Sequence, residues 1–303
     1  MTFIGKTIQG LEEAAISETD GKLNSPGRVE FETLKESYRT LESVYELLTS
    51  FKFKTLKDII EQVKKLKLSI NGTYKCKCSF ESHNQLTSME VEQTCGKAIG
   101  ENNPLDYSPK EYDHAIIIDI VENNCNIGIS KNKTIPERIH RFNLHNQTTP
   151  ATLAASIIKY LNIKKDETLL CIESKDGIIP IEAAFQNINV SANDLHSNNI
   201  RNARINTQLA KKEIQFNSKE ILNLEKSDYM LTQIVFSKKK KGPYKLIHDI
   251  FKLAETKLNN KLVILTNHPK DIESYKPKTI KLLEQKEIKH KKLDLTLLIY
   301  SKE

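Results

Sequence analysis

Residues 169–184, LLCIESKDGIIPIEAA, contain the residue types in this chain that are best suited to chemistry. Glu173, Lys175, Asp176 and Gly177 follow an apolar run and precede an Ile- and Ala-rich helical pattern. A strand, a polar turn and a helix in this order are typical of nucleotide-binding folds, where the turn and the helix N-terminus contact a cofactor. Close approach of the backbone favours several glycines. The turn has one, so a purely structural connection and a working cofactor site both stay open.

Three cysteines and a histidine are the residues most suited to bind a metal ion. Cys76 and Cys78 lie one residue apart in an alternating segment, and His83 and Cys95 follow. Zinc sites usually separate paired cysteines by two to four residues. The pattern fits small buried residues and a loop histidine better, so we expect no metal. The five cysteines are odd in number and lack a disulfide-framework spacing, which indicates a reducing cytoplasm.

The composition predicts a folded protein with a basic surface. The 303 residues allow two or three domains, and 38% hydrophobic with 28% charged residues argues against disorder. No apolar run approaches the roughly 18 residues that span a bilayer. The N-terminus lacks the basic start and apolar core of a secretory signal. The net charge of +7 favours an anionic partner such as nucleic acid, but a general lysine-rich bias explains it equally well.

The part of the chain that must position the turn alternates strands and helices. From residue 148, strand-like runs occur at ETLLCI, INVSAND, EIQFNSK, YMLTQIVF and KLVILTN, and EIKHKKLDLTLLIY predicts a terminal antiparallel pair. We expect Thr149 to cap the first helix, with Pro150 at its first position. The alternation predicts a doubly wound α/β sheet.

The residues before this part predict two smaller segments. The first has strands at TFIGKTI and GRVEFE, a helix at GLEEAAISE, and amphipathic helices over 33–51 and 55–66. The second has strands at TYKCKCSFE, HAIIIDIV and NIGISK, and a helix that Thr87 and Glu90 open as a capping box. The basic stretch KNKTIPERIHRF is interpreted as a linker.

In order and spacing, these segments resemble the THUMP-domain RNA methyltransferases over essentially the whole chain. IQGLEEAAISE, GRVEF and YRTLESVYELL resemble the family's N-terminal domain, CKCSFESHNQLTSMEVEQTCGKAI resembles the THUMP strand, loop and helix, and TPATLAASII resembles the helix before the cofactor turn. The resemblance implies an N-terminal ferredoxin-like domain (1–68), a THUMP α+β domain (69–132), a linker (133–147) and a Rossmann-like methyltransferase domain with a seven-stranded mixed sheet (148–303). The relatives it suggests are archaeal enzymes that methylate the exocyclic amine of a guanosine in transfer RNA.

The resemblance also assigns cofactor roles, and the turn departs from the family there. Members have an Asp-Pro-Phe-Cys-Gly-Ser-Gly type stretch before an Ile-Glu-Ala-Ala helix, which puts Cys171 at the aspartate and Lys175 at the first glycine. The lysine stands where the backbone should meet the methionine part of S-adenosylmethionine, which weighs against binding of this cofactor. The cofactor-binding candidates are Glu173 as a substitute carboxylate, Gly177 at the second glycine, Asp194 at the ribose position and Glu220 near the adenine position.

A second departure follows the fourth strand. Members present Asn-Pro-Pro-Tyr, in which the Asn accepts hydrogen bonds from the target amine and the aromatic ring stacks on the flipped base. Here Gln233 stands at the Asn, Ile234 and Val235 at the prolines and Phe236 at the ring. The amide and the ring are kept, but the stiff turn that aims them is absent, and methyl transfer depends on such positioning. The two departures predict a catalytic domain with lost or weakened activity.

Basic residues outside these turns are expected to contact RNA. By resemblance, Lys75, Lys77 and His83 are candidates for gripping the acceptor end of transfer RNA. The linker adds Lys131, Lys133, Arg138 and Arg141, which we expect to contact the RNA backbone. Phosphate contact and an ordinary solvated loop are equally good interpretations of Lys238, Lys239, Lys240 and Lys241.

Three hypotheses follow. The first is a protein that binds transfer RNA or another structured RNA, with an impaired or inactive catalytic domain. The alternative is an active S-adenosylmethionine-dependent guanosine N2-methyltransferase in which Glu173, Asp194, Gln233 and Phe236 carry the work. The third is a structural interaction protein, which a steep salt dependence of RNA binding would exclude. Family relatives sometimes use a small activating subunit, so such a partner is also expected.

Overall fold

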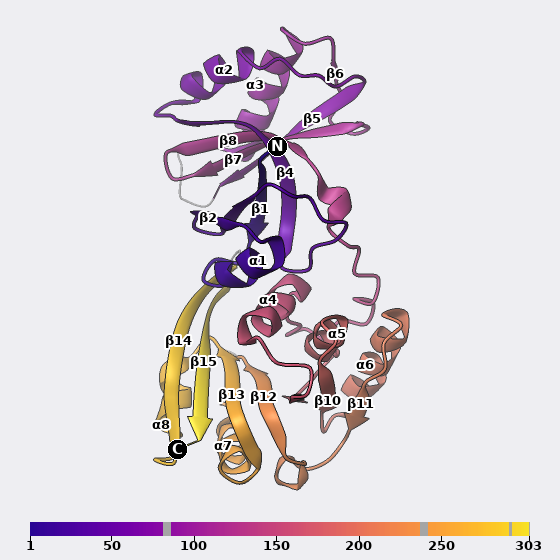
Figure 1. The fold of residues 1–303 in the computed structure, drawn as a ribbon, viewed down its shortest axis with the longest axis vertical. Helices are drawn as coiled ribbons and strands as arrows, with labels where there is room; N and C mark the ends of the chain where they lie inside the picture. Colours follow the sequence, from indigo (N-terminus) through magenta and orange to yellow (C-terminus); the bar gives the residue numbers. More distant parts are fainter. Residues whose placement is uncertain (81–85, 237–241, 291–292, 303) are drawn as a thin grey trace. The chain divides into compact units, whose positions relative to one another are not determined.

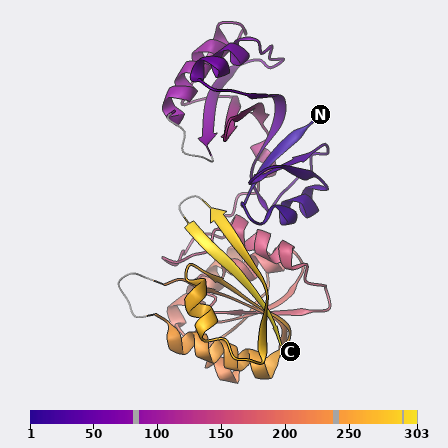
Figure 2. The same cartoon turned by 90° about the vertical axis from the view of Figure 1, so that its left-hand side faces the viewer.

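The computed structural model describes residues 1–80, 86–236, 242–290 and 293–302. The chain forms two compact units, one of Met1–Thr7 with Thr19–Ile135 and the other of Ile8–Glu18 with Pro136–Glu303. Both are drawn in Figures 1 and 2. Among the described residues, no helix has the length and apolar character needed to cross a membrane.

The first unit is built on one eight-stranded mixed sheet with the order β2-β3-β1-β4-β8-β7-β5-β6. Its strands are β1 (Phe3–Thr7), β2 (Lys22–Ser25), β3 (Arg28–Phe31), β4 (Leu41–Lys52), β5 (Thr73–Phe80), β6 (Asp106–Tyr107), β7 (His114–Val121) and β8 (Asn124–Ser130). Helices α2 (Leu56–Lys64) and α3 (Ser88–Gly100) share an apolar core with β5, β7 and β8, and the turn η1 (Asn132–Thr134) follows β8. Thr87 accepts a hydrogen bond from the backbone N–H of Glu90, which confirms the N-cap half of the capping box predicted for α3.

The helix predicted over residues 33–51 is wrong. The strand β4 covers its second half, and residues 33–40 contain no helix. β4 pairs with β1 on one side and with β8 on the other, so its backbone groups are satisfied along the sheet rather than within a helix. Its register shifts between Leu47 and Thr49. Such an irregularity interrupts the alternation of side chains by which a strand is recognised in a sequence.

A buried ion pair connects the two halves of this sheet. Arg28 of β3 donates from Nε and Nη2 to Asp119 of β7 at 2.5 and 2.6 Å, and the two side chains are 0% and 1% exposed. The hydroxyls of Tyr45 and Ser79 also donate to Asp119. Burial raises the pKa of Asp119, but the hydrogen bonds and charge of Arg28 hold it below the ordinary value. Three strands separate β3 from β7 in the sheet order, so this contact requires a strongly curved sheet.

The second unit is a seven-stranded mixed sheet with the order β11-β10-β9-β12-β13-β15-β14. Its strands are β9 (Thr168–Ile172), β10 (Asn189–Asn193), β11 (Gln215–Asn217), β12 (Ser227–Ile234), β13 (Leu258–Thr266), β14 (Ile280–His290) and β15 (Leu293–Lys302). Strand β15 runs antiparallel to both neighbours, and the other pairs are parallel. The predicted doubly wound sheet and its terminal antiparallel pair are confirmed.

Helices cover both faces of this sheet (Figure 1). They are α4 (Ala151–Leu161), α5 (Ile178–Phe185), α6 (Ser197–Leu209), α7 (Tyr244–Lys257) and α8 (Pro269–Ser274), with a short turn η2 (Ile221–Asn223) between β11 and β12. Side chains of α4 and α5 join one apolar core, and those of α7, α8 and η2 join another. The carboxyl ends of β9, β10 and β12 therefore carry the turns that were predicted to form the site.

A segment from the start of the chain completes the second unit. Residues 8–18, which include most of α1 (Glu12–Thr19), place Ile8 and Leu11 in the core beside α4. The backbone N–H of Lys289 in β14 donates to the carbonyl of Gln9 at 3.1 Å. At Gly10 (φ +94°) a Cβ atom would lie 2.1 Å from the carbonyl oxygen of Glu287, so this approach requires glycine.

Candidate functional site

The turn between β9 and α5 is held in an unusual backbone conformation. Glu173, Lys175 and Gly177 all have positive φ, at 55°, 52° and 79°. Only glycine adopts this region without a steric cost. The backbone N–H of Ser174 donates to the carbonyl of Asn193, and that of Gly177 to Ser174. The turn is thus fixed to the end of β10 by main-chain bonds, at a cost in strain for two side-chain-bearing residues.

Gly177 owes its identity to helix packing as well as to its backbone angle. It is the N-cap residue of α5, and a Cβ atom there would lie 2.9 Å from Cβ of Ala203 in α6. The space beside this glycine is therefore occupied by a neighbouring helix. This packing alone explains a glycine at this position, whatever its role toward a cofactor.

Asp194 follows β10 and is completely buried. Oδ2 accepts from the backbone N–H of Lys175 at 2.9 Å, and Oδ1 accepts from that of His196 at 2.9 Å. The side-chain amide of Asn199 lies 3.0 Å from both oxygens. Both carboxylate oxygens are therefore engaged inside the protein, where the resemblance expects a carboxylate turned to ribose hydroxyls.

Lys175 connects this turn to the end of β12. Its Nζ donates to the backbone oxygen of Gln233 at 3.2 Å and to Oε1 of the same residue at 3.3 Å. Both side chains belong to residues that are 8% exposed. Burial lowers the pKa of Lys175 to about 8, against the opposing charges of Glu173, Asp176 and Asp194. Burial and the charge of Asp194 raise the pKa of Glu173.

Thr149 completes this connection rather than capping α4. The N-cap position belongs to Pro150, and no side chain caps the helix. The Thr149 hydroxyl donates instead to Oε1 of Gln233 at 2.6 Å. The predicted capping role was wrong because a buried amide oxygen lies within reach of the hydroxyl.

The residues at the three strand ends do not fit S-adenosylmethionine in this arrangement. The carboxylate expected at the ribose is saturated by protein donors. The two turns that should lie on either side of the reacting groups are hydrogen-bonded to each other through Lys175 and Gln233.

The other two predicted site residues lie apart from this network. Glu220 is exposed and precedes η2. The backbone of Phe236 exchanges hydrogen bonds with the side-chain amide of Asn267, at 2.8 and 3.2 Å. The Phe236 ring stacks on His268 with centroids 4.7 Å apart.

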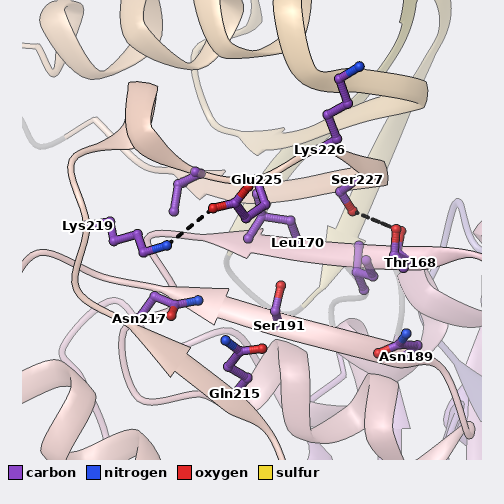
Figure 3. A pocket seen from close by; sticks show the side chains of 12 residues that line it. Thr168, Leu170, Asn189, Ser191, Gln215, Asn217, Lys219, Glu225, Lys226 and Ser227 are labelled. Carbon is purple, nitrogen blue, oxygen red and sulfur yellow. Dashed lines mark hydrogen bonds and ion pairs between the residues drawn. The ribbon is translucent and has the colours of Figure 1, made fainter.

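A pocket of about 230 Å³ lies elsewhere on the sheet, over β9, β10 and β11 (Figure 3). The segment from Lys219 to Ser227 forms its other wall, with Lys219 bonded to Glu225 and Ser227 bonded to Thr168. Its lining contains none of Glu173, Gly177 or Asp194. It is therefore distinct from the predicted cofactor site.

On the first unit, β5 presents two of the predicted RNA contacts together. Lys75 Nζ lies 3.9 Å and Lys77 Nζ 5.8 Å from the ring centroid of Tyr112. A hydrogen bond from Lys75 and the two nearby charges lower the pKa of Tyr112. Sequence reasoning missed this tyrosine, although an aromatic residue in the polar loop before β7 is a usable signal. His83 lies outside the described residues.

The predicted RNA contacts in the linker differ in whether they pair with acidic side chains of the protein. Lys133 is exposed, and Lys131 forms an ion pair with Glu46 at 3.0 Å. The Arg138 side chain is 10% exposed and its Nε lies 3.0 Å from Glu182 of α5. Nε of Arg141 is buried without a partner among the described residues. Residues Lys238, Lys239, Lys240 and Lys241 lie outside the described part of the chain.

The cysteines considered as metal ligands are free thiols. Cys76 and Cys95 are buried and Cys78 is partly exposed. Burial raises the pKa of Cys95 to about 12, and it raises those of Cys76 and Cys78 further. Within the described residues, no group of three or more His, Cys, Asp and Glu side chains is placed to hold a metal ion.

Comparison with known proteins identifies part of the first unit. Residues 53–130 match the family model of the THUMP domain. This part of the chain is a THUMP domain. It contains α2, α3 and β5 to β8, and therefore Lys75, Lys77 and Tyr112.

Solved structures share the fold of the entire chain. TrmN from Thermus thermophilus has a TM-score of 0.82 at 16% identity, covering 100% of this chain and 99% of that one. A possible methylase from Clostridium difficile 630 has a TM-score of 0.81 at 16% identity, and the match covers 100% of this chain and 98% of that one. SMU.472, a putative methyltransferase complexed with SAH, has a TM-score of 0.77 at 14% identity, and the match covers 100% of this chain and 98% of that one. Identities this low show the fold alone, so the chain combines a THUMP domain with a methyltransferase fold. No curated protein sequence matches the chain.

Proposed function

We propose that this chain is a transfer-RNA-binding protein of the THUMP methyltransferase family whose catalytic domain is impaired or inactive. In this proposal residues 1–68 and 69–132 grip the RNA, 133–147 connect them to the catalytic domain, and 148–303 keep the fold of an enzyme without its chemistry. The THUMP domain and its paired Lys75 and Lys77 support RNA binding. Other structured RNAs and a small activating subunit are further candidates as partners.

The observation that carries the catalytic part of the proposal is the contact from Lys175 to Gln233. Lys175 stands where the resemblance expects the backbone to meet the methionine part of the cofactor, and its ammonium group donates to the residue expected to position the target amine. Removing these bonds leaves buried polar groups unsatisfied, which typically costs 1–3 kcal/mol for each group. A ligand that displaces the lysine must therefore supply equivalent hydrogen bonds.

An active guanosine N2-methyltransferase is the second candidate. In its favour, Asp194, Gln233 and Phe236 follow or end the strands at which the resemblance expects them, and the similar structure SMU.472 is complexed with SAH. In that case Glu173 and Asp194 hold the cofactor, and Gln233 and Phe236 position the base.

Calorimetric titration of the full chain with S-adenosylhomocysteine, with and without transfer RNA, distinguishes the two candidates. We expect no heat of binding from the natural chain, and salt-sensitive binding of labelled transfer RNA by fluorescence anisotropy. Micromolar binding of the cofactor product, together with methylation that Gln233→Ala abolishes, would establish the second candidate instead. The variant Lys175→Gly, alone and combined with Gln233→Asn, tests whether these two side chains prevent binding of the cofactor.

A further inference from the structure

Four aromatic rings form a row where β12, α7, β13 and α8 approach one another. Tyr275 stacks on Tyr244 with centroids 5.5 Å apart and planes 18° apart. Tyr244 meets Phe236 edge-on at 6.2 Å, and Phe236 stacks on His268 at 4.7 Å. We call Tyr275, Tyr244, Phe236 and His268 the aromatic row. The rings come from two short stretches of the sequence, 236–244 and 268–275, which the fold brings together.

The inner and outer members of the row differ in burial. Phe236 packs against the apolar core that contains α7. Tyr244 and Tyr275 are 41% and 39% exposed, and their hydroxyls have no hydrogen-bond partner among the described residues. Hydrogen bonds do engage the hydroxyls of other tyrosines, namely Tyr38, Tyr45, Tyr74, Tyr112, Tyr160, Tyr229 and Tyr300. Packing in the core therefore explains the ring of Phe236. It gives no role to the two outer rings, Tyr244 and Tyr275.

The row is held in place before any ligand arrives. The side chain of Asn267 bonds to both backbone groups of Phe236. A Cβ atom on Gly242 would lie 2.6 Å from the Tyr244 ring and 2.9 Å from the Phe236 ring, so the main chain lies directly against them. Rings fixed in this way lose little entropy when a ligand stacks on them.

Exposed lysines lie on the elements that carry the row. Lys245, Lys270 and Lys278 are exposed on or beside α7 and α8. Three acidic residues of α7 and α8 are engaged by neighbouring groups: Asp271 lies 3.1 Å from Nδ1 of His268, Asp249 lies 3.3 Å from Nδ1 of His248, and Glu273 accepts a hydrogen bond from Tyr300. Exposed rings combined with cations are typical of surfaces that bind single-stranded nucleic acid, because every base has a face that stacks and every nucleotide has a phosphate. An apolar peptide would not pair with the lysines, and a free anion would not stack on the rings.

We propose that the aromatic row binds an unpaired segment of RNA by stacking bases on Tyr244 and Tyr275. This inference rests on the proposed RNA-binding function and names the part of the catalytic domain that takes part in it. It does not require cofactor binding, since neither ring belongs to the Lys175 network.

The absence of tryptophan from the chain makes a direct test available. Tyr244→Trp places a single indole in the row, and Leu209→Trp places one on α6 as the control reporter. The probe is a short single-stranded oligoadenylate, titrated into the full-length protein. We expect saturable quenching of the indole in the row and little change in the control. Binding that leaves the Tyr244→Trp emission unchanged overturns the proposal.

Truncation of the rings provides the second arm. Tyr244→Ala and Tyr275→Ala should each weaken oligoadenylate binding by about tenfold, in line with the stacking contribution of one base. Tyr244→Phe and Tyr275→Phe keep the ring and should stay within about twofold of the natural chain, at unchanged melting temperature. Alanine variants that bind normally overturn the stacking surface. If the natural chain binds no transfer RNA even at low salt, the proposed function itself is wrong, whereas transfer-RNA binding without quenching contradicts the stacking proposal alone.

Discussion

Nζ of Lys175 lies 3.2 Å from the backbone oxygen and 3.3 Å from the side-chain oxygen of Gln233, and this contact joins the turn after β9 to the end of β12. The two residues lie in the two turns at which the chain departs from the methyltransferases it resembles. They are not independent losses, since each supplies the other with a hydrogen-bond partner inside the protein. Replacing only one of them is therefore expected to disturb the fold as well as the site.

The stability of the protein should rise with pH above neutrality because of Lys175. Its pKa is lowered by burial from 10.5 to about 8, so between these values the unfolded chain binds more protons than the folded one. The buried charge costs roughly 3 kcal/mol below pH 8. We expect the unfolding free energy of the natural chain relative to Lys175→Met to increase by about 2 kcal/mol between pH 7 and pH 10. Urea titrations measure this, with Lys252→Met as the exposed control. An unchanged difference across this range would contradict the buried position of the ammonium group.

Gly177→Ala should destabilise the protein through two separable causes. Its φ of 79° disfavours any side chain, and the new methyl would lie 2.9 Å from Cβ of Ala203. We expect a loss of about 2 kcal/mol in the free energy of unfolding. The double variant Gly177→Ala with Ala203→Gly removes the collision but keeps the backbone strain, so it should recover part of the loss after allowing for Ala203→Gly alone. If the double variant is no more stable than the sum of the two single-variant effects predicts, α6 does not pack on this turn.

Breaking the Arg28–Asp119 pair should strongly destabilise the first unit. Both groups are buried, and a single replacement leaves the other charge unpaired, which typically costs 3–5 kcal/mol. Arg28→Met and Asp119→Leu should each show this loss in denaturant titrations, and the double variant should lose less than the sum of the two. Additive losses would show that the two side chains do not interact.

Lys75 and Lys77 should contribute to RNA affinity through charge. Replacing both by glutamine should weaken binding of labelled transfer RNA and reduce the slope of log K against log salt by roughly 1.5, since each phosphate contact contributes about 0.7 to 0.9. Lys57→Gln, an exposed lysine on α2, is the matched control. If the double variant retains the salt slope of the natural chain, RNA contact by this pair is excluded.

The sequence located the elements of the second unit better than it described their contacts. The apolar runs and the turns between them predicted the doubly wound sheet, because burial on both faces of parallel strands leaves a strong signal. The hydrogen bonds from Lys175 to Gln233 could not be predicted, because Gln233 is 58 residues away in the chain and only the fold brings the two together. The same holds for Arg138, whose charge suggested RNA contact while its partner Glu182 lies 44 residues away.

Local irregularity explains the main error in the first unit. The spacing of Leu34, Tyr38, Leu41 and Tyr45 matches a helix, but the segment from Leu41 onward pairs with strands on both sides. A register shift is set by neighbouring strands, so a single sequence carries little trace of it. Tyr112 was missed for a related reason, because its contact with Lys75 depends on a loop conformation.

The segment from Ile8 to Glu18 imposes an order on biosynthesis. It packs on β14 and β15, which are synthesised after the other strands and helices of this unit, while its flanking residues belong to the other sheet. The nascent chain must keep this segment undocked until these two strands have been made, which exposes Ile8 and Leu11 to chaperones or to aggregation meanwhile. Expression of residues 136–303 alone would reproduce that unfinished state permanently, so a soluble fragment would need the N-terminal segment supplied as a fused or added peptide.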